Sequence, residues 1–298
     1  MKTKEQTKGI LLAFISMLCY ATSPTILKLA YRTGMASQTI IFDRFLLSLV
    51  LALIPWHFRE KGSDKELHRD QKAFLAAISL FSGLSNLLYN EAYRSLPSVV
   101  STVITLSYAV MVLVLELLSG RKRIQKNRVA AIVMASVGLY LVAIPYLNNR
   151  IESVPLLLGI AASFVYSIQL LLINSNTMKD VSLELIFVAT NIPITLIAGI
   201  SAVANDEPLL AGSLDQAVCI VLLAVLNVLI ARMAFFKAIR LIGAAKASTI
   251  DMLEPFISAI GGYLFFREVL STYTTIGMVL IMAVIFIINV NSKEESKC

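Results

Sequence analysis

Charge is scarce in this chain. Only 15% of its 298 residues are Asp, Glu, Lys or Arg, whereas 57% are hydrophobic. Charged residues make up about 25% of an ordinary soluble domain, which needs them to cover its surface. The composition therefore excludes a typical soluble enzyme or binding domain, and it favours a protein that crosses a membrane several times.

Cysteine and histidine are also rare. The cysteines are Cys19, Cys219 and Cys298, with no CxxC motif among them, and the histidines are His57 and His68. This set supports neither a disulfide framework nor a zinc site, so we expect no metal and no cofactor. GxSxG and HExxH motifs are absent from the sequence. A membrane-embedded enzyme is therefore disfavoured.

The formal net charge is +7, a surplus that could suggest nucleic-acid binding. The basic residues do not form an amphipathic face, however. They lie in short stretches between long apolar runs, for example at Lys61, Lys65, Arg121 and Lys122. We therefore expect a lipid bilayer as partner and no nucleic acid.

Ten apolar segments of about 20 residues, the length that crosses a bilayer as a helix, lie between these basic stretches. The pattern predicts an all-α fold of ten transmembrane helices. The first apolar run is long enough to span, so we expect it to be retained and not removed as a signal peptide. The segments are residues 9–31, 37–56, 73–94, 98–119, 127–146, 154–174, 183–204, 215–239, 245–266 and 271–291.

Lysine and arginine also predict the orientation. They are concentrated on the side of the N terminus, as at Lys4, Lys8 and Arg123, whereas the loop with Asp206 and Glu207 on the other side is acidic. The positive-inside rule then places both termini in the cytoplasm. We expect a multi-pass protein of the plasma membrane.

The sequence contains a weak internal repeat at an offset of 146 residues, at which Tyr20 meets Tyr166 and Arg94 meets Arg240. The repeat predicts two halves, residues 1–150 and 151–298, within one membrane domain. Because each half has five spans, an odd number, the second half enters the membrane from the opposite side. Secondary transporters use such inverted repeats to build two gates around one site.

Ionisable residues within spans are costly unless they face a partner or a wet cavity. Asp251 and Glu254 share one face of the ninth span, and Arg232 lies at a similar depth on the eighth. We expect an ion pair between Arg232 and one of the two acids. It could be structural, or the surplus acid could serve gating and proton coupling. Pro255 is expected to free the carbonyl of Asp251 by kinking the helix.

The third span carries a polar stripe at helical spacing, which must face protein or water. Polar residues on other spans extend it, including Ser23, Asn191 and Asn227. Aromatic and amide groups without a dominant fixed charge suit a small zwitterionic or polar substrate. The expected substrate-binding residues are Tyr20, Asn86, Tyr89, Tyr108, Tyr166 and Gln169.

A second charged pair is expected on the other side of the membrane. Arg44 of the second span can pair with Glu91 of the third, because adjacent antiparallel spans make this contact easy. This pair could be structural, or Arg44 could receive a substrate carboxylate. The fifth and tenth spans carry small residues, such as Ala135 and Gly277, and could buttress the bundle or meet a second copy of the chain in a homodimer.

Several motifs together resemble the drug/metabolite transporter superfamily, EamA type. They are the ten spans in two halves, the basic N terminus, FDRF around Arg44, the Tyr20–Pro24 turn and the LEPFISAIGGYLFFRE run of residues 253–268. The resemblance implies a transporter that exports an amino acid or a related polar metabolite by alternating access, with proton exchange as a possible driving force. The alternatives are a nucleotide-sugar, sugar or amine transporter of the same fold, a lipid flippase, and a membrane scaffold without transport.

Overall fold

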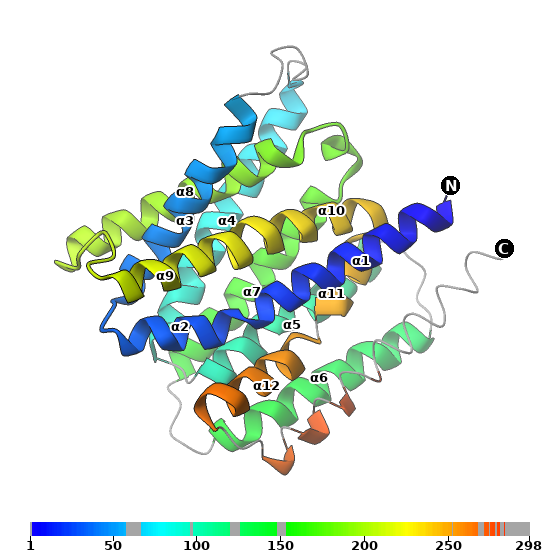
Figure 1. Ribbon diagram of the computed structural model, residues 1–298. Coiled ribbons are helices and arrows are strands. Elements are labelled where there is room, and N and C mark those ends of the chain that lie inside the picture. The colour runs from blue at the N-terminus through cyan, green and yellow to red at the C-terminus, as the bar shows by residue number, and fades with distance from the viewer. Residues whose placement is uncertain are drawn as a thin grey trace.

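The computed structural model is a bundle of helices (Figure 1). It describes residues 2–57, 67–95, 98–119, 126–147, 153–251, 253–267, 271–273, 275–277, 279–280 and 283. All regular elements in this part of the chain are helical, which confirms the predicted all-α fold.

The first nine expected spans coincide with helices. Of the tenth, the described residues between 272 and 283 are helical. The helices are α1 (Lys2–Ala21), α2 (Ser23–Arg32), α3 (Ser37–His57), α4 (Arg69–Ser95), α5 (Ser98–Leu118), α6 (Lys126–Leu147), α7 (Ser153–Ile173), the 3₁₀ turn η1 (Asn176–Met178), α8 (Leu183–Ala204), α9 (Leu214–Leu222), the π-helical stretch η2 (Leu223–Ala231), α10 (Arg232–Ile242), α11 (Ala244–Asp251) and α12 (Glu254–Phe266).

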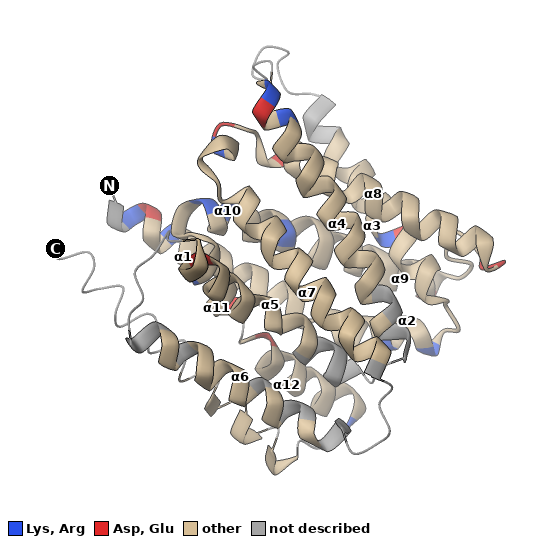
Figure 2. Cartoon of the chain, turned by 180° about the vertical axis from the view of Figure 1, so that it is seen from behind, with Lys and Arg blue, Asp and Glu red and all other residues tan. Residues whose placement is uncertain are grey.

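The outward surface of the bundle is apolar. Large side chains such as Leu80, Leu157 and Ile200 are more than half exposed, an arrangement that suits contact with lipid. Five helical stretches in the described part of the chain have the length and composition needed to cross a bilayer. Charged residues gather toward the ends of the bundle, with few between them (Figure 2).

Contacts between loops and helices define two ends of the bundle. At one end, Gly9 of α1 lies against Ile242 of α10. Arg240 of α10 donates there to the carbonyl oxygens of Met178 and Val181, in the link between α7 and α8. We call this the amino-terminal end, since the N terminus lies here (Figure 1).

At the other end, which we call the far end, the link before α9 is fastened to α3. The Thr39 hydroxyl donates to the Pro208 carbonyl at 2.5 Å, and the Asp43 carboxylate accepts from the Ala211 amide at 2.7 Å. The two hydrogen bonds join the first half of the chain to the second.

Three of the spans are interrupted partway along their length. The first breaks at Thr22, between α1 and α2, and the ninth breaks between Asp251 and Glu254. The eighth stays helical but changes from α to π and back. At the place where a kink was expected, the ninth span is divided into two helices, and Pro255 lies in the first turn of α12, where its missing N–H costs no helical bond.

The backbone at the first break is held by side chains from other spans. The Asn227 amide of η2 donates to the carbonyl oxygen of Cys19 and, at 3.2 Å, to the Thr22 hydroxyl. Ser258 of α12 donates to the carbonyl oxygen of Ala21 at 3.1 Å. These bonds satisfy backbone oxygens that the interrupted helix leaves open.

The interrupted spans pack against one another. The α1 helix contacts α10, α11 and α12, and α2 contacts α9 and α12. Lys28 and Arg32 of α2 both lie over the Phe266 ring of α12, 4.9 and 4.6 Å from its centroid. The α12 helix therefore packs against both parts of the interrupted first span.

Close packing of α8 on α3 depends on Gly199, since a Cβ there would lie 2.8 Å from the Phe42 ring. We expect Gly199→Ala to lower the free energy of unfolding by about 1–3 kcal/mol through overpacking. Thermal unfolding of the purified protein in detergent measures the change. Gly212→Ala is the matched control, because its nearest contact would be an ordinary 3.7 Å. Equal stability of the two variants would contradict this packing.

Candidate functional site

A buried hydrogen bond joins α5 to the end of α11. The Tyr108 hydroxyl donates to Oδ2 of Asp251 at 2.6 Å. Asp251 is only 3% exposed, and its second oxygen, Oδ1, has no hydrogen-bond partner among the described residues. The carboxyl group is thus held on one side and open on the other.

Tyrosines surround this carboxyl group. The Tyr166 ring of α7 meets the Tyr108 ring edge to face, with centroids 4.9 Å apart at 84°. Tyr166 is also close enough to Tyr20, Tyr89 and Arg232 to interact with them electrostatically. The spans that carry these residues are far apart in the sequence, and the fold brings their polar groups together in the interior.

Tyr89 and Tyr20 are held by contacts of their own. The hydroxyls of Tyr89 and Ser163 lie 3.1 Å apart. Since Ser163 donates to the Ile104 carbonyl at 2.7 Å, Tyr89 is the donor in this pair. The Tyr20 ring packs edge to face on Phe235, with centroids 6.5 Å apart. Tyr20, Tyr89, Tyr108 and Tyr166 line a common polar region.

Arg232, the first residue of α10, does not form the ion pair that the sequence suggested. Its Nη1 donates to Oδ1 of Asn191 in α8 at 2.7 Å, and its guanidinium lies over the Phe45 ring, 5.2 Å from the centroid. Asp251 bonds to Tyr108 instead. The prediction failed because a similar depth in the membrane does not fix the direction of a side chain. Arg232 contacts Asn191 of α8, Phe45 of α3 and Tyr20 of α1, whereas Asp251 bonds to Tyr108 of α5.

Glu254 begins α12 directly after the break and is half-buried. Its carboxyl group lies close enough to that of Asp251 for the two to interact electrostatically. The site therefore holds two neighbouring acids, and a cation bound to neutral groups. The described residues contain no cluster of three or more His, Cys, Asp or Glu that could hold a metal ion.

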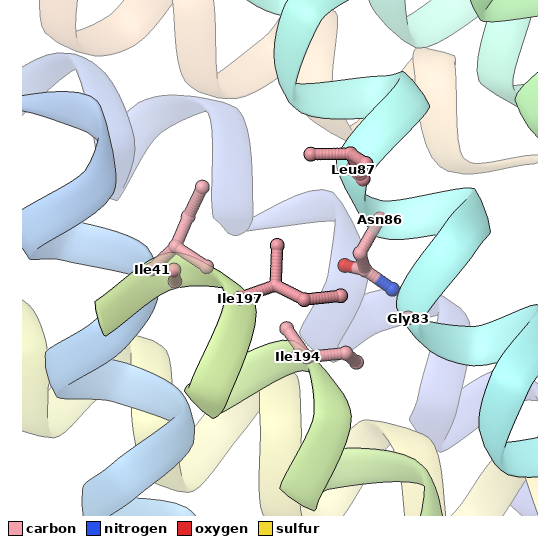
Figure 3. A pocket seen from close by; sticks show the side chains of 7 residues that line it. Ile41, Gly83, Asn86, Leu87, Ile194 and Ile197 are labelled. Carbon is pink, nitrogen blue, oxygen red and sulfur yellow. The ribbon is translucent and has the colours of Figure 1, made fainter. Parts of the chain in front are cut away.

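Asn86 and Gln169 take no part in the hydrogen bonds and ring contacts described above for the tyrosines. Asn86 faces a small void of about 10 Å³ between α3, α4 and α8, where Ile41, Ile194 and Ile197 surround it (Figure 3). Such a void holds about one water molecule. Gln169 is 1% exposed, and its Oε1 has no partner in the described part of the chain. The prediction that Asn86 lines the same site as the tyrosines is not supported by this geometry.

The second charged pair is only partly described. The Arg44 guanidinium lies 5.2 Å from the centroid of Phe45, the ring that also contacts Arg232. The side chain of Glu91 lies outside the described residues. Phe45 and Ser163 contribute to the site without having been predicted, since a lone Phe and a small-residue run are typical of ordinary helix packing. Asn191 was recognised as polar, but not as the partner of Arg232.

The bond between Tyr108 and Asp251 is testable by a double-mutant cycle. Tyr108→Phe and Asp251→Ala should each destabilise the protein. We expect a coupling energy of about 1–3 kcal/mol, because either substitution alone already removes the hydrogen bond and the double variant cannot lose it a second time. Thermal unfolding in detergent supplies the four stabilities. Tyr166→Phe with Asp251→Ala is the control cycle, since Tyr166 shares the ring contact but not this bond. A coupling as small as that of the control would refute the bond.

Comparison with known proteins places this geometry in a family. The chain is 26% identical over 287 residues to the uncharacterized transporter YcbK of Bacillus subtilis (strain 168), an alignment that covers 93% of this chain and 91% of the relative. A solved crystal structure of another protein has the same fold, with a TM-score of 0.72 at 15% identity over 97% of this chain and 98% of that one. The model of the EamA-like transporter family matches twice, at residues 7–144 and 153–290. The chain is therefore a multi-pass membrane protein with a duplicated helical fold, and it belongs to the EamA-like transporter family.

Proposed function

We propose that this transporter moves a small zwitterionic metabolite, an amino acid or a related compound, by alternating access. The observation that carries the proposal is the buried group of Tyr108, Tyr166, Asp251 and Arg232, which lies where three spans are interrupted. In a membrane protein, buried ionisable groups at such breaks are typical of a substrate or ion path.

The chemistry of the site matches both ends of an amino acid. Asp251 has an open carboxyl oxygen and Glu254 lies nearby, so a substrate ammonium group has two acids to meet. Arg232 can receive a carboxylate, because its present partners Asn191, Phe45 and Tyr20 are all neutral. The tyrosine faces and hydroxyls suit the remainder of a small polar molecule.

Proton coupling is part of the proposal. Two neighbouring carboxyl groups in a low-dielectric interior repel each other when both are ionised. Either a proton or a substrate ammonium relieves this repulsion, so the two compete for one place. Competition of this kind links export of substrate to entry of a proton.

The proposed orientation and location are supported by the distribution of basic residues, whereas the proposed direction of transport, export, is an expectation from the family resemblance. With Lys and Arg concentrated at the amino-terminal end, the positive-inside rule puts both termini in the cytoplasm of a cell whose plasma membrane holds the protein. Asp251, Glu254 and Arg232 would then receive substrate from the cytoplasm and release it at the far end.

An amine without a carboxylate is the second candidate. It is favoured by the two acids and by the way in which Arg232 is already occupied by Asn191 and Phe45. Such a substrate would need Asp251 and Glu254, but not the guanidinium of Arg232. Sugars and nucleotide sugars fit less well, since phosphate recognition requires more cations than Arg232 supplies.

A ligand screen by thermal unfolding separates these classes. We expect amino acids to raise the unfolding temperature, because a ligand at 100 times its Kd stabilises the native state by about 2.7 kcal/mol. Matched amines that lack the carboxylate should stabilise less. Stabilisation by sugars or nucleosides alone would contradict the proposed substrate class.

Transport in proteoliposomes tests the coupling. With the amino acid that gives the largest thermal shift, an imposed pH gradient should drive uptake by the wild-type protein but not by the Asp251→Asn, Glu254→Gln double variant. Asp215→Asn changes an exposed acid at the start of α9 and should leave the response intact. A double variant that still responds to the gradient would remove both acids from the coupling mechanism.

A further inference from the structure

Two glutamines, one in each half of the chain, occupy equivalent places in the fold. Gln71 is the third residue of α4, and Gln216 is the third residue of α9. Both follow an aspartate, and Gln216 stands one residue before the position that the 146-residue offset assigns to Gln71. The helices that they begin are the third spans of the two halves.

The two side chains make the same pair of hydrogen bonds. Each Oε1 accepts from a backbone amide just before its own helix, that of His68 at 3.0 Å for Gln71 and that of Gly212 at 2.8 Å for Gln216. A glutamine at the third helical position often caps a helix in this way. Capping alone would explain the Oε1 bond of Gln71. The Oε1 bond of Gln216 reaches one residue farther, because Ser213 is the N-cap of α9 and Gly212 precedes it.

The amide nitrogens of the two glutamines each donate a further hydrogen bond, which capping does not require. Nε2 of Gln71 donates at 3.3 Å to the carbonyl oxygen of Thr177, in the link between α7 and α8. Nε2 of Gln216 donates at 3.0 Å to the carbonyl oxygen of Thr33, in the link between α2 and α3. Each glutamine thus binds the link after the first span of the opposite half.

The two bonds lie at opposite ends of the bundle. Thr177 belongs to the link that Arg240 also holds, at the amino-terminal end. Thr33 adjoins the link before α9, which Thr39 and Asp43 fasten at the far end. Both glutamines are half-buried, although their neighbours Asp70 and Asp215 are exposed, as expected for side chains turned toward the bundle.

We propose that Gln71 and Gln216 are paired gate-positioning residues, each closing one end of the transporter by latching the two halves together. This inference rests on the proposed alternating access. Opening one end separates the halves there, so it breaks the latch at that end while the other holds. The two bonds are alike in kind but close opposite ends. Loss of the Gln71 bond and loss of the Gln216 bond should therefore shift the balance between the two open states in opposite directions.

Substitution by glutamate separates the latch from the cap. A glutamate keeps the oxygen that caps the helix, but it has no N–H to donate and its charge repels the carbonyl oxygen opposite. We therefore expect Gln71→Glu to favour the state that is open at the amino-terminal end, and Gln216→Glu to favour the state open at the far end. Net loss of one neutral hydrogen bond corresponds to roughly a two- to tenfold shift.

The readout is the labelling rate of a cysteine in the site, which requires no substrate. Ser163→Cys, in a chain whose three native cysteines are replaced by serine, is treated with a membrane-impermeant maleimide from either side of sealed vesicles. Proteolysis of an N-terminal tag identifies the side of the amino terminus. Lys72→Gln and Leu214→Glu are the controls, because each makes the same change of charge at an exposed position near the corresponding glutamine.

We expect Gln71→Glu to raise the labelling rate from the amino-terminal side relative to the far side, and Gln216→Glu to lower this ratio. In the double variant the ratio should return toward the parent value. Shifts in the same direction, or no shift beyond the controls, would overturn the latches while leaving the site intact. Failure of the reagent to reach Ser163→Cys from either side in all variants would overturn the proposed access path, and with it the gates.

Discussion

The structure depends on satisfying backbone hydrogen-bonding groups where no water is available. A continuous helix does this within itself, but a break in a span exposes carbonyl and amide groups to an apolar medium at a cost of several kcal/mol each. In the first span the cost is offset by Asn227, Thr22 and Ser258, which bond to the carbonyls of Cys19 and Ala21. The polar centre exists because these side chains make the breaks tolerable.

The same principle governs the charges. Arg232 is compensated by the Asn191 amide, the Phe45 ring and Tyr20, and Asp251 by the Tyr108 hydroxyl, so none of the described acids is bonded directly to the base. An ion pair between Arg232 and Asp251 would have locked the eighth span to the ninth, because separating a buried pair is costly. Neutral partners hold each charged group in position, and replacing such a partner with a substrate group costs less than separating a buried ion pair. This suits a site that must bind and release a charged molecule many times.

Much of this architecture is readable in the sequence, because spans and their boundaries depend on length and apolar content. The α8 helix has the predicted bounds, and the four tyrosines among the expected binding residues share one polar region. Partners were harder to predict, because they depend on the direction in which a side chain leaves its helix. Arg232 and Asn86 illustrate this. Arg232 was expected to meet an acid and bonds to Asn191 of α8, and Asn86 was expected beside the tyrosines and faces a void lined mainly by apolar residues.

The π-helical stretch η2 changes which residues of the eighth span share one side of the helix. In an α-helix, residues five apart point in different directions, whereas the i to i+5 bonds of a π-helix bring them onto one side. Asn227 and Arg232 are five apart, and η2 ends directly before Arg232. Asn227 bonds to the break in the first span, and Arg232 reaches the interior beside Tyr20. The π-helical stretch thus places Asn227, which bonds to the backbone of the first span, and Arg232 on the same side of the eighth span. Regular α-helical spacing would not predict this arrangement.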